Sequence, residues 1–257
     1  MSSQEMPSHS SRDRASAAGA AGWILCFLLA HHLAVIVHEY AHSFVAFALG
    51  YKDHPLRIQW GGLGVSNLLL LSNVDEHVDY QSMFAQGAGW AVALVALAGP
   101  GFGNGLTYLV SLFMVNRRRG RDEQGDWTLL FAYALNVMSV GNFFSYVPIR
   151  TFVSHGDIAH ISQGLDVSPW LPLIVLGLPT MLALCWLFKR TMPDVQRRFA
   201  PESLSRQRTL VASTAAIIFG FFGTSGLSGY GEAAQVLSCI SLGIAPVVAF
   251  LTWPRRH

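Results

Sequence analysis

Residues 23–49 read WILCFLLAHHLAVIVHEYAHSFVAFAL, and within them Glu39 is the only Asp, Glu, Lys or Arg. About 20 predominantly apolar residues are enough for a helix to cross the hydrocarbon core of a bilayer. The stretch therefore predicts a membrane-spanning helix, and it places a single carboxylate inside that helix.

The composition of the whole chain agrees with a membrane protein. Asp, Glu, Lys and Arg make up 12% of the 257 residues, against roughly 25% in soluble proteins. Apolar residues make up 52% and the mean hydropathy is +0.39, which excludes an ordinary water-soluble globule. The formal net charge of +2 gives no basic bias toward a nucleic-acid partner.

The charged residues are clustered, and the charge-poor gaps between them predict six spans. These spans lie at 23–49, 86–115, 128–148, 169–188, 209–228 and 233–252. Each is helical, because a chain that crosses lipid must satisfy its backbone hydrogen bonds internally and no alternating barrel pattern is present. The predicted fold class is an all-α integral membrane protein with six transmembrane helices.

Basic residues gather on one predicted side of the bilayer. That side holds Arg12, Arg14, Arg117, Arg118, Arg119, Arg121, Lys189, Arg190, Arg197, Arg198, Arg206, Arg208, Arg255 and Arg256. The other side holds only Lys52, Arg57 and Arg150. Because cytoplasmic loops carry the excess of Lys and Arg, we expect a multi-pass protein of the plasma (inner) membrane with both termini cytoplasmic.

The connection between the first two spans, residues 50–85, is long enough for structure of its own. Its segment 58–72 mixes apolar residues with turn-forming glycines, among them Gly61 and Gly62. This pattern suggests a short re-entrant β-hairpin at the membrane interface, whose free strand edge could bind an extended peptide. The alternative is an inert interfacial loop.

The chemistry of the first span lies in His38-Glu39-Tyr40-Ala41-His42. Residues four apart lie one helical turn apart on the same face. Two imidazoles can therefore hold one zinc ion, while Glu39 beside them takes a proton from bound water. The alternative is a pair of core histidines hydrogen-bonded to other helices, with Glu39 protonated or paired, but three costly polar groups on one turn of a membrane helix favour a functional site.

The chain resembles the site-2 protease family of intramembrane zinc metalloproteases. The segment from His38 to Gly50, with small residues after the second histidine and a closing glycine, is similar to the zinc-binding helix of that family. Ala98-Gly99-Pro100 is similar to its Ala-Gly-Pro segment. The family usually has an asparagine three residues after that proline, whereas here Asn104 comes one residue later.

The resemblance also implies a third zinc ligand, an aspartate that follows an Asn and a Pro. Here the corresponding residues are Asn142, Pro148 and Asp157, although Asp157 is followed by Ile158 and stands farther from Asn142 than in the compact family motif. A carboxylate also suits a catalytic zinc, which takes three protein ligands and keeps a position open for water. Two flanking histidines stay open as rival ligands, namely His155 and His160.

These observations predict an intramembrane zinc metalloprotease that cleaves a transmembrane protein substrate in the lipid bilayer. The metal ligands are His38, His42 and Asp157, Glu39 is the catalytic base, and the cofactor is Zn²⁺. Candidate substrate-binding residues are Asn142, Pro148, Gly61 and Gly62. The alternative function is a non-proteolytic protein on the same scaffold that binds zinc or transmembrane helices. A di-iron oxidase would need more histidines near the spans than the chain has.

The chain is predicted to consist of three parts. Residues 1–22, rich in Ser and Ala, are predicted to form a disordered tail. Residues 23–165 hold every motif above and are predicted to form a three-helix catalytic core. Residues 166–257 are predicted to add three transmembrane helices.

Overall fold

The computed structural model describes residues 9–117, 125–227 and 229–255, with side chains described from Gly19 onward. All secondary structure in this part is helical, and no strand is present in it. The α-helices are α1 (His9–Ala48), α2 (Val65–Leu70), α3 (Tyr80–Ala85), α4 (Gly89–Leu97), α5 (Asn104–Arg117), α6 (Trp127–Phe144), α7 (Asp157–Gly164), α8 (Trp170–Trp186), α9 (Met192–Phe199), α10 (Leu204–Ala215) and α11 (Glu232–Leu251). Four π-helical segments continue them, η1 (Ala98–Gly103), η2 (Ser145–Ile149), η3 (Leu187–Thr191) and η4 (Ala216–Phe222).

Five helical segments in the described part are long and apolar enough to cross a membrane. They are Gly19–Ala48, Gly89–Arg117, Trp127–Ile149, Trp170–Phe199 and Glu232–Leu251. The all-α membrane architecture predicted from the sequence is therefore supported, and each of these five segments overlaps one predicted span.

The predicted fifth span, 209–228, differs from the others. The chain there forms α10 and η4, which together run over 204–222. Arg206 and Arg208 lie in the first turns of α10, and they lower its hydropathy below that of the other five segments. The helix also ends at Phe222, six residues before the predicted end of the span.

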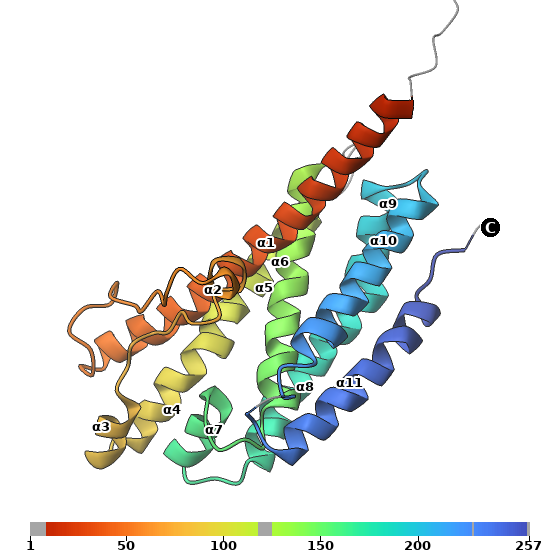
Figure 1. Ribbon diagram of the computed structural model, residues 1–257. Coiled ribbons are helices and arrows are strands. Elements are labelled where there is room, and N and C mark those ends of the chain that lie inside the picture. Colours follow the sequence, from red (N-terminus) through yellow and green to blue (C-terminus); the bar gives the residue numbers. More distant parts are fainter. Residues whose placement is uncertain (1–8, 118–124, 228, 256–257) are drawn as a thin grey trace, which may run out of the picture.

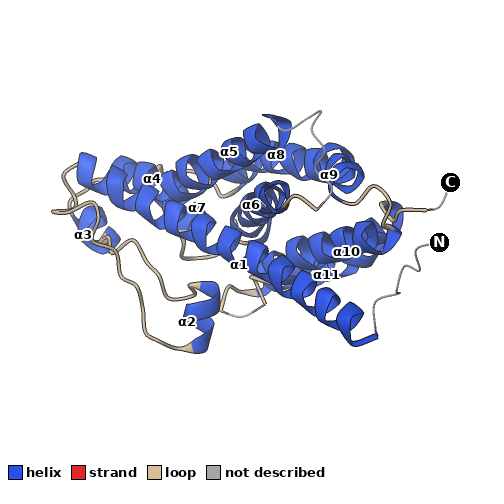
Figure 2. Ribbon diagram, turned by 90° about the horizontal axis from the view of Figure 1, so that it is seen from above, coloured by secondary structure: helices blue, strands red, loops and turns tan. Residues whose placement is uncertain are grey.

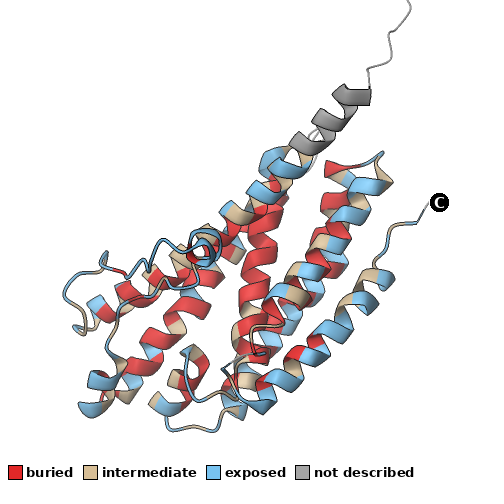
Figure 3. Ribbon diagram, viewed as in Figure 1, coloured by how far each residue is buried: buried red, intermediate tan, exposed pale blue. Residues whose placement is uncertain are grey.

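Helix α6 lies at the centre of the molecule. Figure 2 shows it nearly end-on, with α1, α5, α8 and α10 around it. Most of its residues are buried (Figure 3), as a helix in the middle of a bundle requires.

Polar side chains join α6 to its neighbours. The pairs are Thr107 Oγ1 with Ser139 Oγ at 2.8 Å, Asn136 Nδ2 with Ser111 Oγ at 2.9 Å, and Tyr133 OH with Thr214 Oγ1 at 2.6 Å. Between membrane helices such hydrogen bonds and close van der Waals packing supply the specificity that apolar burial supplies in water. They fix α5 and α10 against the central helix.

The outward faces of the helices are apolar. Leu109 on α5, Ile174 on α8 and Phe250 on α11 are each more than 60% exposed. Soluble monomers rarely expose apolar surfaces of this extent, so these faces fit contact with lipid chains.

The connection that follows α1 is not the predicted β-hairpin. Gln59 and Asp75 form a single antiparallel bridge, and the chain between them winds into α2 rather than into strands. Asn67 holds this loop, since its Nδ2 donates to Trp60 O at 2.7 Å and Gly62 O at 2.8 Å. Its Oδ1 accepts from the Asn73 N–H at 2.9 Å. A buried side-chain amide thus replaces the ladder that a hairpin would need.

The first helix extends farther toward the N-terminus than its predicted span. It begins at His9, so part of the predicted tail, residues 9–22, is helical. Residues 1–8 of that tail lie outside the described residues.

Candidate metal centre

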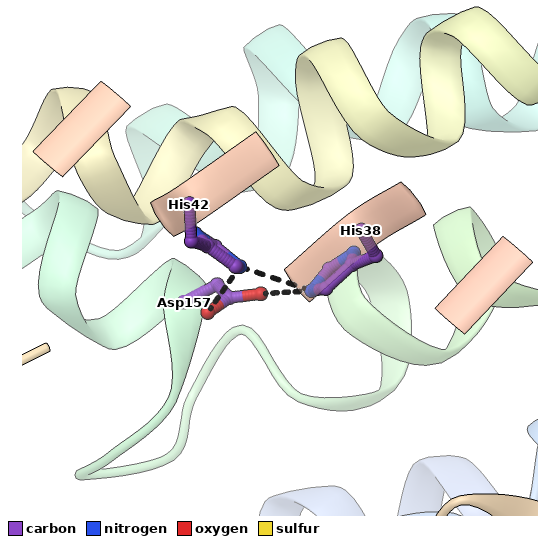
Figure 4. A group of neighbouring side chains, drawn as sticks. All are labelled: His38, His42 and Asp157. Atoms are coloured by element: carbon purple, nitrogen blue, oxygen red, sulfur yellow. Dashed lines mark hydrogen bonds and ion pairs between the residues drawn. The ribbon is translucent and has the colours of Figure 1, made fainter. Parts of the chain in front are cut away.

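Three predicted residues from two distant parts of the chain meet at one point. His38 and His42 lie one turn apart on α1, and Asp157 is the first residue of α7. Figure 4 shows both rings and the carboxylate pointing toward one another. The two histidine Nε2 atoms are 3.0 Å apart. Asp157 Oδ2 lies 3.2 Å from His38 Nε2, and Asp157 Oδ1 lies 3.5 Å from His42 Nε2.

The far side of each imidazole is held by a partner of its own. His42 Nδ1 donates to the carbonyl oxygen of Val95 at 2.6 Å. Asn104 Nδ2 lies 3.1 Å from His38 Nδ1, and Asn142 Nδ2 donates to Asn104 Oδ1 at 3.4 Å. A half-turn of the Asn104 and Asn142 amides together presents the Asn104 oxygen to His38 Nδ1–H, lets Asn104 Nδ2 donate to Asn142 Oδ1, and leaves Nε2 of His38 free to bind a metal. Such outer contacts orient metal-binding histidines.

The π-helix η1 explains why Asn104 stands four residues after Pro100. A π-turn takes in one residue more than an α-turn, so the extra residue still leaves Asn104 against His38. The departure from the three-residue spacing noted in the sequence is absorbed by the backbone.

Two glycines let η1 approach α1 closely. A Cβ on Gly103 would lie 2.7 Å from His38 Cα, and a Cβ on Gly99 would lie 2.1 Å from His42 Nε2 and 2.6 Å from His38 Nε2. Both positions therefore exclude any side chain. The space beside the two Nε2 atoms is kept open by Gly99.

The donor set fits zinc. One nitrogen from each of the two imidazoles and one carboxylate oxygen lie within 4.8 Å of one another, and two histidines with one carboxylate form a known set of ligands for catalytic zinc. Asp157 Oδ2 is buried, and its 3.2 Å contact with His38 Nε2 lacks hydrogen-bond geometry. Burial opposes its ionisation, but the imidazoles of His42 and His38 outweigh that effect and hold the pKa of Asp157 well below its usual range. The carboxylate is therefore charged, as a metal ligand must be.

Glu39 lies beside this group and is buried as well, with 8% of its surface exposed. The charged groups that act on it are His42, Glu76 and Asp157. Its role as the base that takes a proton from bound water stays a prediction.

Comparisons with known proteins give no match. No family model, no curated protein and no solved structure is similar to this chain at a significant level. The chemistry of the site therefore has to be argued from its own residues.

The predicted substrate-binding residues are separated from one another. Asn142 lies at the site, where it contacts Asn104, and Pro148 lies in η2, the segment that follows Asn142. Gly61 has a φ of +70° and packs against Asn73, while nothing lies within 4 Å of a Cβ on Gly62. These two glycines belong to the connection 49–79 that carries α2, here called the α2 loop, and in the described part of the chain no contact joins them to the three ligands.

The rival ligands lie outside the group. Within the described residues, the only cluster with metal-binding geometry is His38, His42 and Asp157. His155 is exposed and stacks on Tyr230 with ring centroids 4.9 Å apart. His160 packs against Tyr80 with ring centroids 4.4 Å apart. Of the candidates for the third ligand, the structure brings Asp157 alone to the two imidazoles.

Several residues around the site are not distinguished by the sequence alone. Tyr146 stacks on the His38 ring at 4.7 Å, and the Arg150 guanidinium lies 4.1 Å over the Tyr146 ring. Glu76 is a buried acid in the loop before α3. Glu76 carries no sequence signal of this kind, because its place depends on how the loop folds back. Tyr146 lies in η2, inside a predicted span, where an aromatic residue is not distinguished from the other apolar residues.

Proposed function

We propose that this protein is an intramembrane zinc metalloprotease, which hydrolyses a peptide bond in or near a transmembrane segment of another protein. The observation that carries the proposal is the meeting of His38, His42 and Asp157 beside a buried Glu39. Structural needs alone do not explain so many ionisable groups on one turn of an apolar helix, where each is costly.

Each residue of the site has a separate role in the proposed reaction. His38, His42 and Asp157 would hold the metal, which when bound supplies a Lewis acid for a carbonyl and for water. Glu39 would accept the proton of the attacking water and return it to the leaving amine. Val95 and Asn104 keep the rings aimed at the metal position. The likeness of these motifs to site-2 proteases supports the same reaction class.

The exposed loop before α7 is the proposed route by which water reaches the metal ligands. Ser154, His155 and Gly156 are exposed, and they lead directly to Asp157, whose side chain is 13% exposed. Water can reach the ligands from this side without crossing lipid. A peptide carbonyl in a helix is hydrogen-bonded, so the substrate has to unwind locally before attack.

We also propose that α10 and η4 form a sixth crossing, with both chain ends cytoplasmic in the plasma (inner) membrane. Figure 1 shows α1 beginning and α11 ending toward the same end of the bundle, at the upper right, which needs an even number of crossings. The excess of Arg and Lys near both ends favours the cytoplasmic side.

The test combines metal analysis with cleavage of a membrane-anchored reporter. Purified wild-type protein is expected to contain one zinc per chain and to cleave the reporter. Glu39→Gln should keep the zinc and lose cleavage by roughly 10²-fold or more, because only the proton-transfer group is removed. Asp157→Ala should lose both zinc and cleavage.

The matched control is Glu202→Gln, which makes the same change at an exposed residue between α9 and α10. It should behave as wild type. A Glu39→Gln protein that cleaves at the wild-type rate contradicts the mechanism. Zinc that needs Asp157, together with no cleavage of any membrane substrate by wild type, supports the non-proteolytic alternative instead.

A further inference from the structure

Two buried polar atoms next to the candidate metal centre have no hydrogen-bond partner among the described residues. They are the hydroxyl of Tyr80 on α3 and Nδ1 of His160 on α7. Their rings pack against each other at 4.4 Å with an angle of 30° between the planes. Buried polar groups are nearly always paired. Two neighbouring side chains with unpaired polar atoms are therefore positioned to bind a ligand.

Both side chains border the metal ligands. His160 follows Asp157 by three residues on α7, which puts the two on one face of the helix. Glu76 is the acid that acts most strongly on the Tyr80 hydroxyl, although the two groups lack hydrogen-bond geometry, and Asp157 and Glu39 act on it as well. The charges that act on His160 include those of Asp157 and His42. The pair is therefore within electrostatic range of Asp157.

Each group has a proton to donate. Burial, with the nearby acids, raises the pKa of Tyr80 far above its usual range, so its hydroxyl stays protonated. Burial lowers the pKa of His160, so the ring is neutral and carries one N–H. Neutral donors that face a forming negative charge are the usual means of stabilising an oxyanion.

We propose that Tyr80 and His160 donate hydrogen bonds to the oxyanion of the tetrahedral intermediate, an inference that rests on the proposed peptidase function. Water oxygen bonds to the scissile carbonyl carbon, the carbonyl π electrons move to its oxygen, and Glu39 takes the water proton. The carbonyl then re-forms, the C–N bond breaks, and the amine leaves with the proton from Glu39. The products are one carboxylic acid and one amine, so the reaction needs no other reactant.

The proposal is tested by binding of a tetrahedral anion, with benzylphosphonate as the probe. Purified protein is loaded with Co²⁺, and the probe is titrated while the visible absorption of the cobalt is followed. Tyr80→Phe keeps the contact between the two rings and removes only the hydroxyl. It is expected to weaken phosphonate binding about tenfold, with the affinity for Co²⁺ and the spectrum of the probe-free protein unchanged.

The matched control is Tyr51→Phe, at a tyrosine in the loop after α1, which should bind the probe as wild type does. His160→Asn keeps a donor near the place of Nδ1 and should weaken binding less than His160→Leu. Phosphonate affinity that is equal in Tyr80→Phe and wild type overturns the donor pair, as does wild-type cobalt protein that binds no phosphonate. Failure of wild type to bind Co²⁺ or Zn²⁺ instead contradicts the proposed function itself.

Discussion

Gly99 is the residue on which the metal position depends most directly. A Cβ at this position would lie within 2.1 Å of His42 Nε2 and 2.6 Å of His38 Nε2. The shorter of these distances is that between zinc and a histidine nitrogen, about 2.0–2.1 Å. A methyl group here would compete with the metal for the same space.

We therefore expect Gly99→Ala to lower zinc affinity by more than about 100-fold, beyond the loss typical of an outer contact. Competition with a chelator of known affinity measures the change. Gly101→Ala is the control, since its Cβ would meet only the Leu97 side chain, at 3.4 Å. Equal zinc affinity in Gly99→Ala and Gly101→Ala would show that the metal does not bind at this point.

Among the individual residues of the site, the sequence predicts those that lie on one helix. His38 and His42 are placed by helical spacing alone, which is a local property of the chain. Asp157 is expected only through the resemblance and the need for a carboxylate, because the loop that brings it to α1 has no periodic pattern. Tyr80 and His160 meet across two short helices, and such a contact depends on the tertiary structure.

Among the elements, the α2 loop shows most clearly where the pattern in the sequence misleads. Apolar residues mixed with glycines predict a hairpin, yet hydrogen bonds from side chains set the conformation. His31 Nε2 lies 2.9 Å from Leu70 O and His32 Nε2 lies 3.1 Å from Leu68 O, so α1 holds α2 at its C-terminal end. Side-chain bonds to backbone compete with regular structure in this way, and the composition of the segment does not reveal them.

Asn67 is the internal support of that loop, and its removal should loosen the loop without unfolding the bundle. Asn67→Ala removes three hydrogen bonds to backbone groups, at an expected cost of about 1–3 kcal/mol. Hydrogen exchange should then speed up in residues 58–75 and stay unchanged in α6. Asn116→Ala, at an exposed position near the end of α5, should change neither region. Equal exchange in 58–75 for wild type and Asn67→Ala would mean that the α1 histidines hold the loop by themselves.

For the whole molecule, the number of crossings decides which parts of the chain share a side with the metal site. The loop before α7 opens to Asp157, and the turn before α11 also approaches it, since His155 stacks on Tyr230 and Arg150 Nη1 donates to Tyr230 OH at 3.3 Å. Because of these contacts, the start of α11 lies on the same side of the membrane as the loop before α7. If α10 and η4 cross the bilayer, the turn between α9 and α10 lies on the opposite side.

Labelling of single cysteines in sealed vesicles tests this arrangement. The background carries Cys26→Ala, Cys185→Ala and Cys239→Ala, which removes the free thiols of the chain. Glu202→Cys and Glu232→Cys, both at exposed positions, flank α10 and η4. A membrane-impermeant maleimide is expected to label only one of them before the vesicles are permeabilised and both afterwards. Labelling of both from one side would instead show that α10 and η4 enter and leave the bilayer on the same face. The segment would then be re-entrant, the chain would cross five times, and its two ends would lie on opposite sides of the membrane.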